Sequence, residues 1–183
     1  MAYPGKKISN RQSGQSILFL QTAKDTEGQL LEMETVYSPL SNEPAPHFHP
    51  YQDELFTVVS GELTVRINGS TTTLTPGQQI KIPRNTIHSM WNHSSRLTVV
   101  NWKVMPALET EEFLENAMGL AHDGKINNNG MPTLLQVALM AKRYEAEFRL
   151  AKPSLLVQKL LFTVLQPFAL LAGLKPSYKK YID

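Results

Sequence analysis

The 183-residue chain contains no cysteine. Without thiols it can form no disulfide framework, thiolate metal site or cysteine nucleophile, so any bound metal must rest on nitrogen and oxygen ligands. Long apolar runs are also scarce near the N-terminus, where residues 17–20 are too short a run for a secretory signal. We therefore expect a cytoplasmic protein. The sequence has no phosphate-binding loop, nucleophile elbow or nucleic-acid motif, so we expect no nucleic-acid partner.

The net charge of +2 is small but unevenly distributed. From residue 142 to the end there are eight basic residues against three acidic ones, so the rest of the chain is net negative. A block of this size is usually a solvated face. The apolar fraction of 42 % is enough for a real core, and the length suits one ordinary domain with or without an appendage.

Residues 16–105 have the pattern of short strands separated by turns. Apolar residues alternate in several segments, and Asn68-Gly69 is a strong hairpin signal. Pro76-Gly77 marks another turn between two β-rich segments. This half of the chain therefore predicts an antiparallel sandwich or barrel.

After Met105-Pro106 the periodicity becomes helical. The sequence predicts a first helix with Thr110 as its N-cap and Gly124 at its end. A second helix is predicted over residues 131–150, from the apolar spacing.

A third helix should begin at Pro153 and be kinked or ended by Pro167. We predict a mainly β domain over residues 1–106 and a helical extension over 107–183. The extension should pack on the β domain or on a dimer partner.

The segment "PHFHPYQDELFTVVSGEL", residues 46–63, holds two of the five histidines. His47 and His49 stand two apart, so on a strand they share a face. Glu54 begins the next strand, and His88 lies on a later one after a turn. Each histidine alone would be structural or exposed, but together these four donors form the nitrogen and oxygen set that a divalent metal needs. Asp53 should face away from that site.

Two motifs in this region resemble those of the cupin family over about residues 15–105. The first, HxH, four residues, Glu, six residues, Gly, consists of His47, His49, Glu54 and Gly61. The second consists of Gly77, Pro83, His88 and Asn92, with Asn85 in place of the inner glycine. Asn tolerates the left-handed backbone conformation, so that departure is mild. Ser41 stands where a glycine often opens the first motif.

The resemblance implies a double-stranded β-helix, a jelly-roll barrel with one metal at its mouth. The ligands would be His47, His49, Glu54 and His88, and the metal would be Fe, Mn, Ni, Co, Cu or Zn. Several cupins with this ligand set are dioxygenases that cleave flavonols or other enolisable diketones (quercetinase-like), in which the glutamate can act as base. Other relatives are metal-dependent isomerases or bind a small molecule without turnover, and a metal-free relative would leave the ligand set idle.

Three apolar residues share faces with the expected ligands, namely Phe56, Val58 and Met90. We expect them to line an apolar mouth that binds a small substrate with an anionic oxygen. Arg66 and Arg84 could bind a substrate carboxylate if they reach this mouth. Trp91 and Trp102 are interpreted as packing residues on strands.

Residues 155–174 form the longest apolar stretch, followed by a basic and aromatic flank up to Tyr181. We favour a helix buried between the barrel and a second copy, because cupins commonly form homodimers. A spanning helix is disfavoured, since Lys159, Gln166 and Pro167 interrupt the stretch. An interfacial helix, with residues 155–181 on an anionic membrane, is the remaining alternative.

Overall fold

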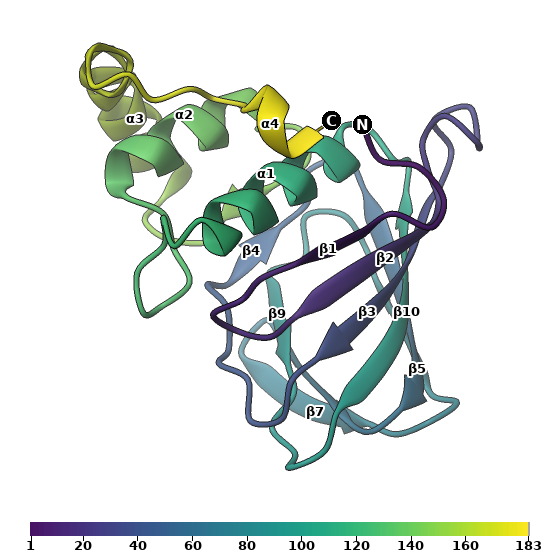
Figure 1. The fold of residues 1–183 in the computed structure, drawn as a ribbon. Helices are drawn as coiled ribbons and strands as arrows, with labels where there is room; N and C mark the ends of the chain where they lie inside the picture. The colour runs from purple at the N-terminus through teal and green to yellow at the C-terminus, as the bar shows by residue number, and fades with distance from the viewer. Residues whose placement is uncertain (183) are drawn as a thin grey trace.

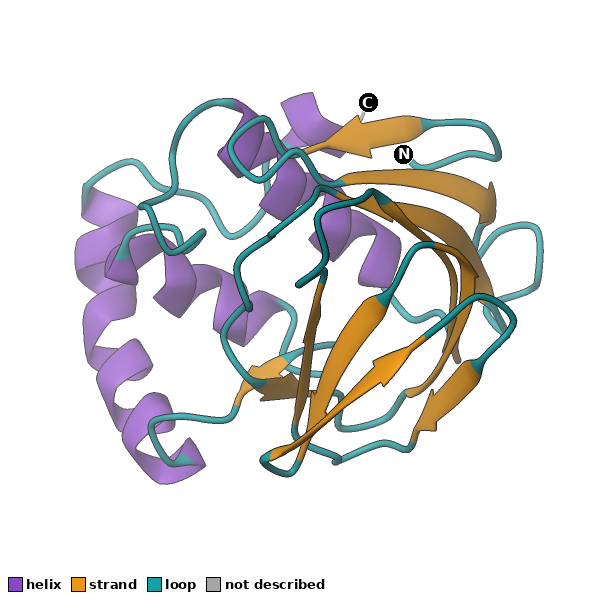
Figure 2. Ribbon diagram, turned by 90° about the horizontal axis from the view of Figure 1, so that it is seen from below, coloured by secondary structure: helices purple, strands orange, loops and turns teal. Residues whose placement is uncertain are grey.

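The computed structural model describes residues 1–182, which form two antiparallel sheets with four helices gathered on one side (Figures 1 and 2). The six-stranded sheet has the order β1-β2-β3-β10-β5-β8. Its strands are β1 (Lys7–Ser9), β2 (Ser16–Gln21), β3 (Leu31–Tyr37), β10 (Thr98–Met105), β5 (Asp53–Ser60) and β8 (Gln79–Ile82). The five-stranded sheet has the order β11-β4-β9-β6-β7. Its strands are β11 (Arg149–Leu150), β4 (His47–Phe48), β9 (His88–Trp91), β6 (Leu63–Ile67) and β7 (Ser70–Leu74).

From β3 onward the barrel strands pass repeatedly from one sheet to the other, which is the winding of a double-stranded β-helix. In β3 and β5 every second side chain is buried, as a strand with one face on the core requires. These inward side chains meet between the sheets in a cluster that contains Tyr37, Phe56, Val58, Leu63, Val65, Leu74, Ile82, Met90 and Val100. The predicted fold class, a mainly β jelly roll with C-terminal helices, is confirmed.

Local turn chemistry agrees with the sequence at two positions. Asn68 and Gly69 both have positive φ, 47° and 91°, and they join β6 to β7 in a two-residue hairpin. Asn85 has a φ of 62°, the left-handed conformation expected where it replaces a glycine.

The helices are α1 (Thr110–His122), α2 (Leu134–Arg143), α3 (Leu155–Leu171) and α4 (Lys179–Ile182). Leu114 and Met118 of α1 share a core cluster with residues of β2, β3 and β10. α3 packs on α2 and lies far from the main barrel strands (Figure 1). No helix within residues 1–182 is long and apolar enough to cross a membrane.

The prediction that Thr110 caps α1 is wrong, whereas Gly124 does follow the end of that helix. Thr110 is the first helical residue, and the N-cap is Glu109, whose side chain makes no capping bond. The Thr110 hydroxyl instead accepts a hydrogen bond of 2.7 Å from the buried amide of Gln52. The Thr110 hydroxyl therefore bonds to Gln52, which is distant in the sequence, and not to a backbone N–H of its own helix.

The second helix is shorter than predicted. α2 ends at Arg143, where Tyr144 forms the C-cap with its backbone N–H bonded to Met140. Residues 149–150 leave the helical conformation and pair with β4 as strand β11. Helical spacing continues through Phe148 in the sequence, so the pattern does not mark this end, and it cannot show the non-local pairing of residues 149–150 with β4.

The third helix begins at Leu155, two residues later than predicted, with Ser154 as its N-cap. Pro167 lies inside α3 and does not end it, since the helix continues to Leu171. A proline removes one backbone donor, a loss that the flanking turns of a long helix can bear.

Candidate metal centre

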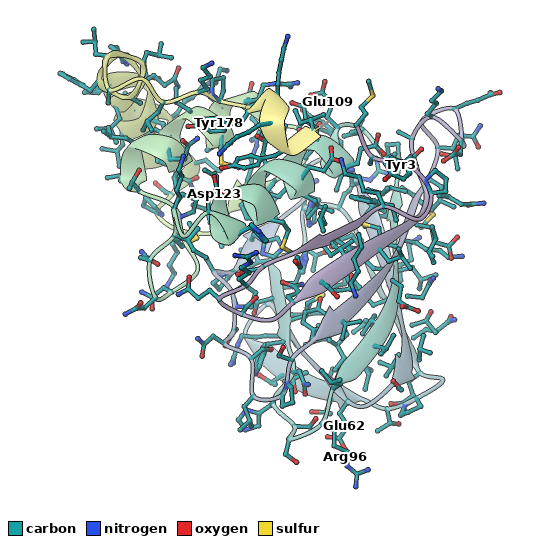
Figure 3. All side chains as sticks on the ribbon, in the orientation of Figure 1. Tyr3, Glu62, Arg96, Glu109, Asp123 and Tyr178 are labelled. Carbon is teal, nitrogen blue, oxygen red and sulfur yellow. The ribbon has the colours of Figure 1, made fainter. Side chains whose placement is uncertain are left out.

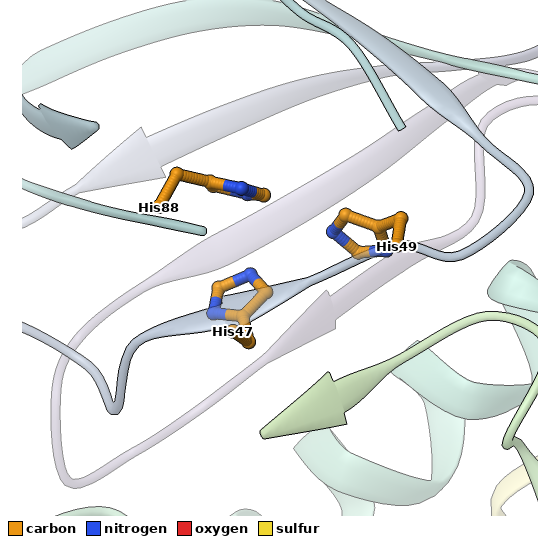
Figure 4. Close-up of side chains that lie close together, drawn as sticks. All are labelled: His47, His49 and His88. Carbon is orange, nitrogen blue, oxygen red and sulfur yellow. The ribbon is translucent and has the colours of Figure 1, made fainter. Parts of the chain in front are cut away.

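Three imidazoles meet where β4 and β9 pair at one end of the barrel. His47 is the first residue of β4 and lies opposite His88, the first residue of β9, while His49 directly follows β4. One ring nitrogen from each lies within 4.8 Å of the other two. Figure 4 shows the three rings turned toward a common point. The strand spacing thus brings all three predicted histidines together, and such a group can hold a metal ion.

The other ring nitrogen of each histidine is engaged by a backbone carbonyl. His47 Nδ1 lies 3.0 Å from the Ala45 oxygen, and His88 Nδ1 lies 2.9 Å from the Thr86 oxygen. His49 Nδ1 lies 2.5 Å from the Glu147 oxygen. Because a carbonyl only accepts, each Nδ1 must donate its proton, which leaves Nε2 of the neutral ring with a free lone pair. This is the tautomer in which a histidine binds metal through Nε2.

Glu54 joins the group from the six-stranded sheet. Its Oε2 lies 2.9 Å from His88 Nε2 and 3.3 Å from His49 Nε2. Neither contact has hydrogen-bond geometry, so these three buried atoms have no hydrogen-bond partner among residues 1–182. Three converging, unpartnered nitrogen and oxygen atoms would be costly in a closed core. A cation shared between them removes that cost, so the residues present fit a metal.

The charge balance of the group depends on these contacts. Burial alone would raise the pKa of Glu54, but the positive charge that His49 and His88 can carry outweighs burial and lowers it. Burial lowers the pKa of His47, which keeps its ring neutral. Burial also acts to lower the pKa of His88, but the adjacent Glu54 carboxylate raises it above the usual value. In the metal-free site the ionised Glu54 carboxylate therefore favours a proton on His88, and a metal would displace that proton on binding.

Trp102 belongs to the site, although the sequence suggested only a packing role. Its indole N–H donates a hydrogen bond of 2.9 Å to Glu54 Oε1. The ring also stacks on Phe56, with centroids 5.5 Å apart. The sequence did show a tryptophan on a predicted strand. Only the pairing and register of that strand with the strand of Glu54 reveal that the indole reaches the carboxylate.

Two further residues were missed because they lie in the predicted second helix. The Glu147 carbonyl accepts from His49, and the Phe148 ring stacks on His47 with centroids 4.7 Å apart. Both residues come from the helical extension. No local signal in the sequence could connect them to histidines about a hundred positions earlier.

Phe56, Val58 and Met90 were expected to line the mouth, and none of them lines the hollow beside His88. All three are buried in the cluster between the sheets. They do face inward, as the alternation predicted, but they pack against other core side chains. The apolar ring beside the imidazoles is Phe148 instead.

The charged residues near the site point outward. Asp53 faces away from Glu54, as predicted, and pairs with Arg84 and Lys81 at the surface. Arg66 pairs with Glu43 through two hydrogen bonds of 2.8 and 3.1 Å. Neither arginine is therefore directed at the imidazole cluster.

A hollow of about 480 Å³ lies beside His88. It is bounded by both the barrel and the extension, and its lining residues are Ala45, Pro46, Arg66, Gly69, Ile87, His88, Ser89, Leu150, Ala151 and Lys152. Most of these are apolar, with two cationic side chains at its border. This composition suits a small organic molecule with an anionic group.

An antiparallel barrel of two sheets, with an imidazole cluster at one end, defines a class of β-helix proteins with a candidate metal centre. The family model of the cupin domain matches residues 33–102. Residues 33–102 of this barrel therefore form a cupin domain. The structure of a predicted oxalate decarboxylase from Thermotoga maritima is similar in fold, with a TM-score of 0.50, 17 % identity, and coverage of 55 % of this chain and 90 % of that one.

Among curated proteins, the chain is similar to quercetin 2,3-dioxygenase of Bacillus subtilis, with 28 % identity over 103 residues. The matched region covers 56 % of this chain and 29 % of that protein. It is 30 % identical over 131 residues to epoxidase atD of Aspergillus terreus, 64 % of this chain and 40 % of that protein. It is 26 % identical over 137 residues to the probable oxidoreductase patJ of Penicillium expansum, 69 % of this chain and 42 % of that protein. The chain thus spans less than half the length of these relatives.

Proposed function

We propose that this protein binds one divalent transition metal and is a dioxygenase acting on a small, enolisable or anionic organic substrate. The observation that carries the proposal is the buried convergence of His49 Nε2, His88 Nε2 and Glu54 Oε2, with every Nδ1 bonded to a carbonyl. His47, His49, Glu54 and His88 would hold the metal. The ligand list does not select among Fe, Mn, Ni, Co, Cu and Zn, because availability decides between them.

A metal bound there would supply Lewis-acid and redox chemistry at a position open to substrate and oxygen. Three neutral imidazoles and one carboxylate would leave a divalent ion with one net positive charge, which favours an enolate or carboxylate. Despite burial, the charge that His49 and His88 can carry lowers the pKa of Glu54, which favours the ionised carboxylate that a ligand needs. Its predicted second role, removal of a substrate proton, would need the carboxylate to leave the metal.

The activities of the curated relatives support an oxidative reaction for this protein. One is a quercetin 2,3-dioxygenase, and two others are an epoxidase and a probable oxidoreductase. Because the chain spans less than half of each, their substrates are not carried over. The hollow beside His88, with apolar walls and Arg66 and Lys152 at its border, is where we would expect the substrate to approach.

The first test is the metal content of untagged protein, measured by plasma mass spectrometry. We expect near one equivalent of a transition metal in the parent and its loss in His47→Ala and His88→Ala. His93→Ala is the matched control, because His93 is an exposed histidine on the adjoining turn and should leave the metal in place. A parent that takes up no metal after reconstitution would contradict the proposal.

Oxygen consumption by the metal-loaded protein then tests the reaction class. We expect uptake with a flavonol or a β-diketone and none with the His88→Ala variant. A metal-loaded protein that binds such compounds but consumes no oxygen would be a small-molecule-binding cupin without turnover. That result would overturn the dioxygenase assignment and keep the metal site.

A further inference from the structure

The segment Glu147–Ala151 of the helical extension lies directly on the candidate metal centre. As strand β11 it pairs with β4, placing Leu150 opposite His47. The Ala151 N–H also donates a hydrogen bond of 2.9 Å to the Pro46 oxygen. The sheet that carries the histidines is therefore completed at its edge by residues from the far side of the sequence.

Glu147 connects this segment to His49 and to α1. Its carbonyl accepts the Nδ1 proton of His49. Its buried carboxylate accepts a hydrogen bond of 3.2 Å from the backbone N–H of Glu109, the N-cap of α1. Glu147 thus lies between α2 and β11 and is bonded through its carboxylate to the start of α1, which restricts the position of its carbonyl.

Phe148 supports the second histidine of the pair. Its ring stacks on His47 with an interplanar angle of 29°. It stacks in turn on Phe113 of α1, with centroids 5.1 Å apart, and meets the edge of His49. A ring held between an imidazole and a helical phenylalanine has little freedom, so it restricts the rotamer of His47.

We propose that the helical extension is part of the metal centre, with Phe148 the positioning residue for His47 and the Glu147 carbonyl the one that orients His49. The barrel alone supplies the donor atoms, but two of them are oriented by the extension. Groups that orient metal ligands in this way commonly change metal affinity 10- to 100-fold when they are lost. This inference rests on the proposed metal site.

The test compares Phe148→Ala, Phe148→Tyr and the control Phe168→Ala, which removes an exposed ring elsewhere in the extension. Co²⁺ affinity is measured by competition with a chromophoric chelator, and the Co²⁺ absorption spectrum reports the ligand geometry. We expect Phe148→Ala to weaken Co²⁺ binding about 10-fold and to alter the spectrum. Phe148→Tyr should restore both, and Phe168→Ala should match the parent.

The two proposals fail in different ways. A parent that binds no Co²⁺ overturns the metal site and the inference with it. A parent that binds Co²⁺, together with a folded Phe148→Ala variant of equal affinity and identical spectrum, overturns the inference alone. A circular dichroism spectrum of each variant establishes folding, so loss of structure is not mistaken for loss of positioning.

A different observation concerns the outward face of α3. Leu171 is 86 % exposed, Leu156 70 % and Leu160 64 %, and Val164 and Phe168 are also exposed. The polar residue Gln158 is turned inward, where its amide donates to the Leu150 and Pro153 carbonyls. The buried residues of α3 also include Phe162 and Ala169, so apolar side chains lie on both faces, and an exposed apolar face of this kind marks a contact surface.

The charge around α3 favours an anionic lipid surface as the occupant. Residues 148–182 contain six basic residues and no acidic residue. Five of them, Lys152, Lys159, Lys175, Lys179 and Lys180, are exposed, and Lys180 pairs with Asp123. A second copy of the chain would bring the same basic segment to this face. That segment contains no acidic residue to pair with the lysines.

We infer that α3 lies in the plane of an anionic membrane, with its apolar face inserted and its lysines near the headgroups.

The aromatic residues at the end of the chain have another role, which the sequence did not predict. The Tyr178 hydroxyl donates a hydrogen bond to the Gln136 side chain of α2, and its backbone N–H donates one to the Asn116 side chain of α1 (Figure 3 labels Tyr178). The Tyr181 hydroxyl donates to the Asp123 carboxylate. They attach the tail to α1 and α2 and do not flank α3.

Flotation with phosphatidylcholine vesicles, with and without phosphatidylserine, tests this surface. We expect the parent to bind only the phosphatidylserine vesicles, less so at high salt. Leu160→Ser with Val164→Ser should reduce binding to the phosphatidylcholine level, while Leu97→Ser, an exposed leucine of the barrel, should not. No binding of the parent overturns the inference, and a parent dimer that Leu160→Ser with Val164→Ser dissociates would assign the face to a second copy.

Discussion

The indole N–H of Trp102 donates a hydrogen bond to Oε1 of Glu54, and the other oxygen of that carboxylate faces His49 and His88. The two residues lie on the paired strands β10 and β5, whose register sets Val104 opposite Glu54 and Trp102 opposite Phe56. One oxygen of Glu54 is therefore fixed by the barrel wall, and the second is directed at the candidate metal. Metal ligands are commonly oriented by such a partner.

Replacing Trp102 by Phe should remove this donor while keeping a ring to stack on Phe56. We expect metal affinity to fall about 10-fold, because Glu54 loses the bond that orients it. A competitive titration of the metal-free protein with a chromophoric chelator measures the change. An affinity equal to that of the parent would show that the indole is only a packing group, as the sequence suggested.

The Glu43 carboxylate links the loop before His47 to β6 and β9. It accepts two hydrogen bonds from Arg66 and one of 2.5 Å from the Ser89 hydroxyl. The hydrogen bond from Arg66 is the main reason that the pKa of Glu43 is lowered. Glu43→Gln should lower the free energy of unfolding at neutral pH by about 0.5 to 1 kcal/mol, since the pair is partly exposed and screened by solvent.

The pH dependence of this difference has a definite sign. A carboxyl group whose pKa is lower in the folded state contributes stability above its unfolded pKa and loses it as the pH falls through its folded pKa. Parent and Glu43→Gln should therefore differ above the usual value of 4.5 and converge as the pH falls below it. Urea unfolding in a pH series measures this, and a difference that grows in acid would contradict it.

Asn92 is fully buried and joins three segments of the barrel. Its amide donates to the carbonyls of Ser38 and Arg96 at 3.0 and 2.6 Å, and its oxygen accepts from the Ser94 backbone at 2.9 Å. Asn92→Ala leaves these groups without partners, so we expect a loss of about 3 kcal/mol in the free energy of unfolding. Ser94→Ala, which removes only a hydroxyl, should cost less than about 1 kcal/mol in the same denaturant titration.

Gly61 and Gly69 both have positive φ, 76° and 91°, but they differ in the space around them. A Cβ at Gly61 would lie 2.3 Å from the Leu97 carbonyl oxygen, whereas nothing lies within 4 Å of one at Gly69. Gly69→Ala should cost about 1 kcal/mol of backbone strain alone. Gly61→Ala should cost at least about 2 kcal/mol more, because backbone atoms must move. Equal melting temperatures for the two variants would contradict this.

The histidine cluster could be predicted from the sequence because its information is local. His47 and His49 share a face through the two-residue period of a strand, and the same alternation buries Glu54 and turns Asp53 outward. Hairpins such as the one at Asn68-Gly69 depend on backbone conformations that few residue types adopt. These properties belong to single segments, so the sequence predicted an antiparallel sandwich or barrel and the set of candidate ligands, and the resemblance to the cupin family implied the β-helix winding.

Only the tertiary structure decided how those ligands are held. Glu147 is 98 positions from His49, and a helical pattern covers it, yet it lies in the turn between α2 and strand β11, which pairs with β4. Phe148 and Trp102 likewise reach the site through register and packing between distant segments. Helical periodicity reports the preference of an isolated segment, whereas the pairing of β11 with β4 depends on a partner edge that exists only once the barrel has folded.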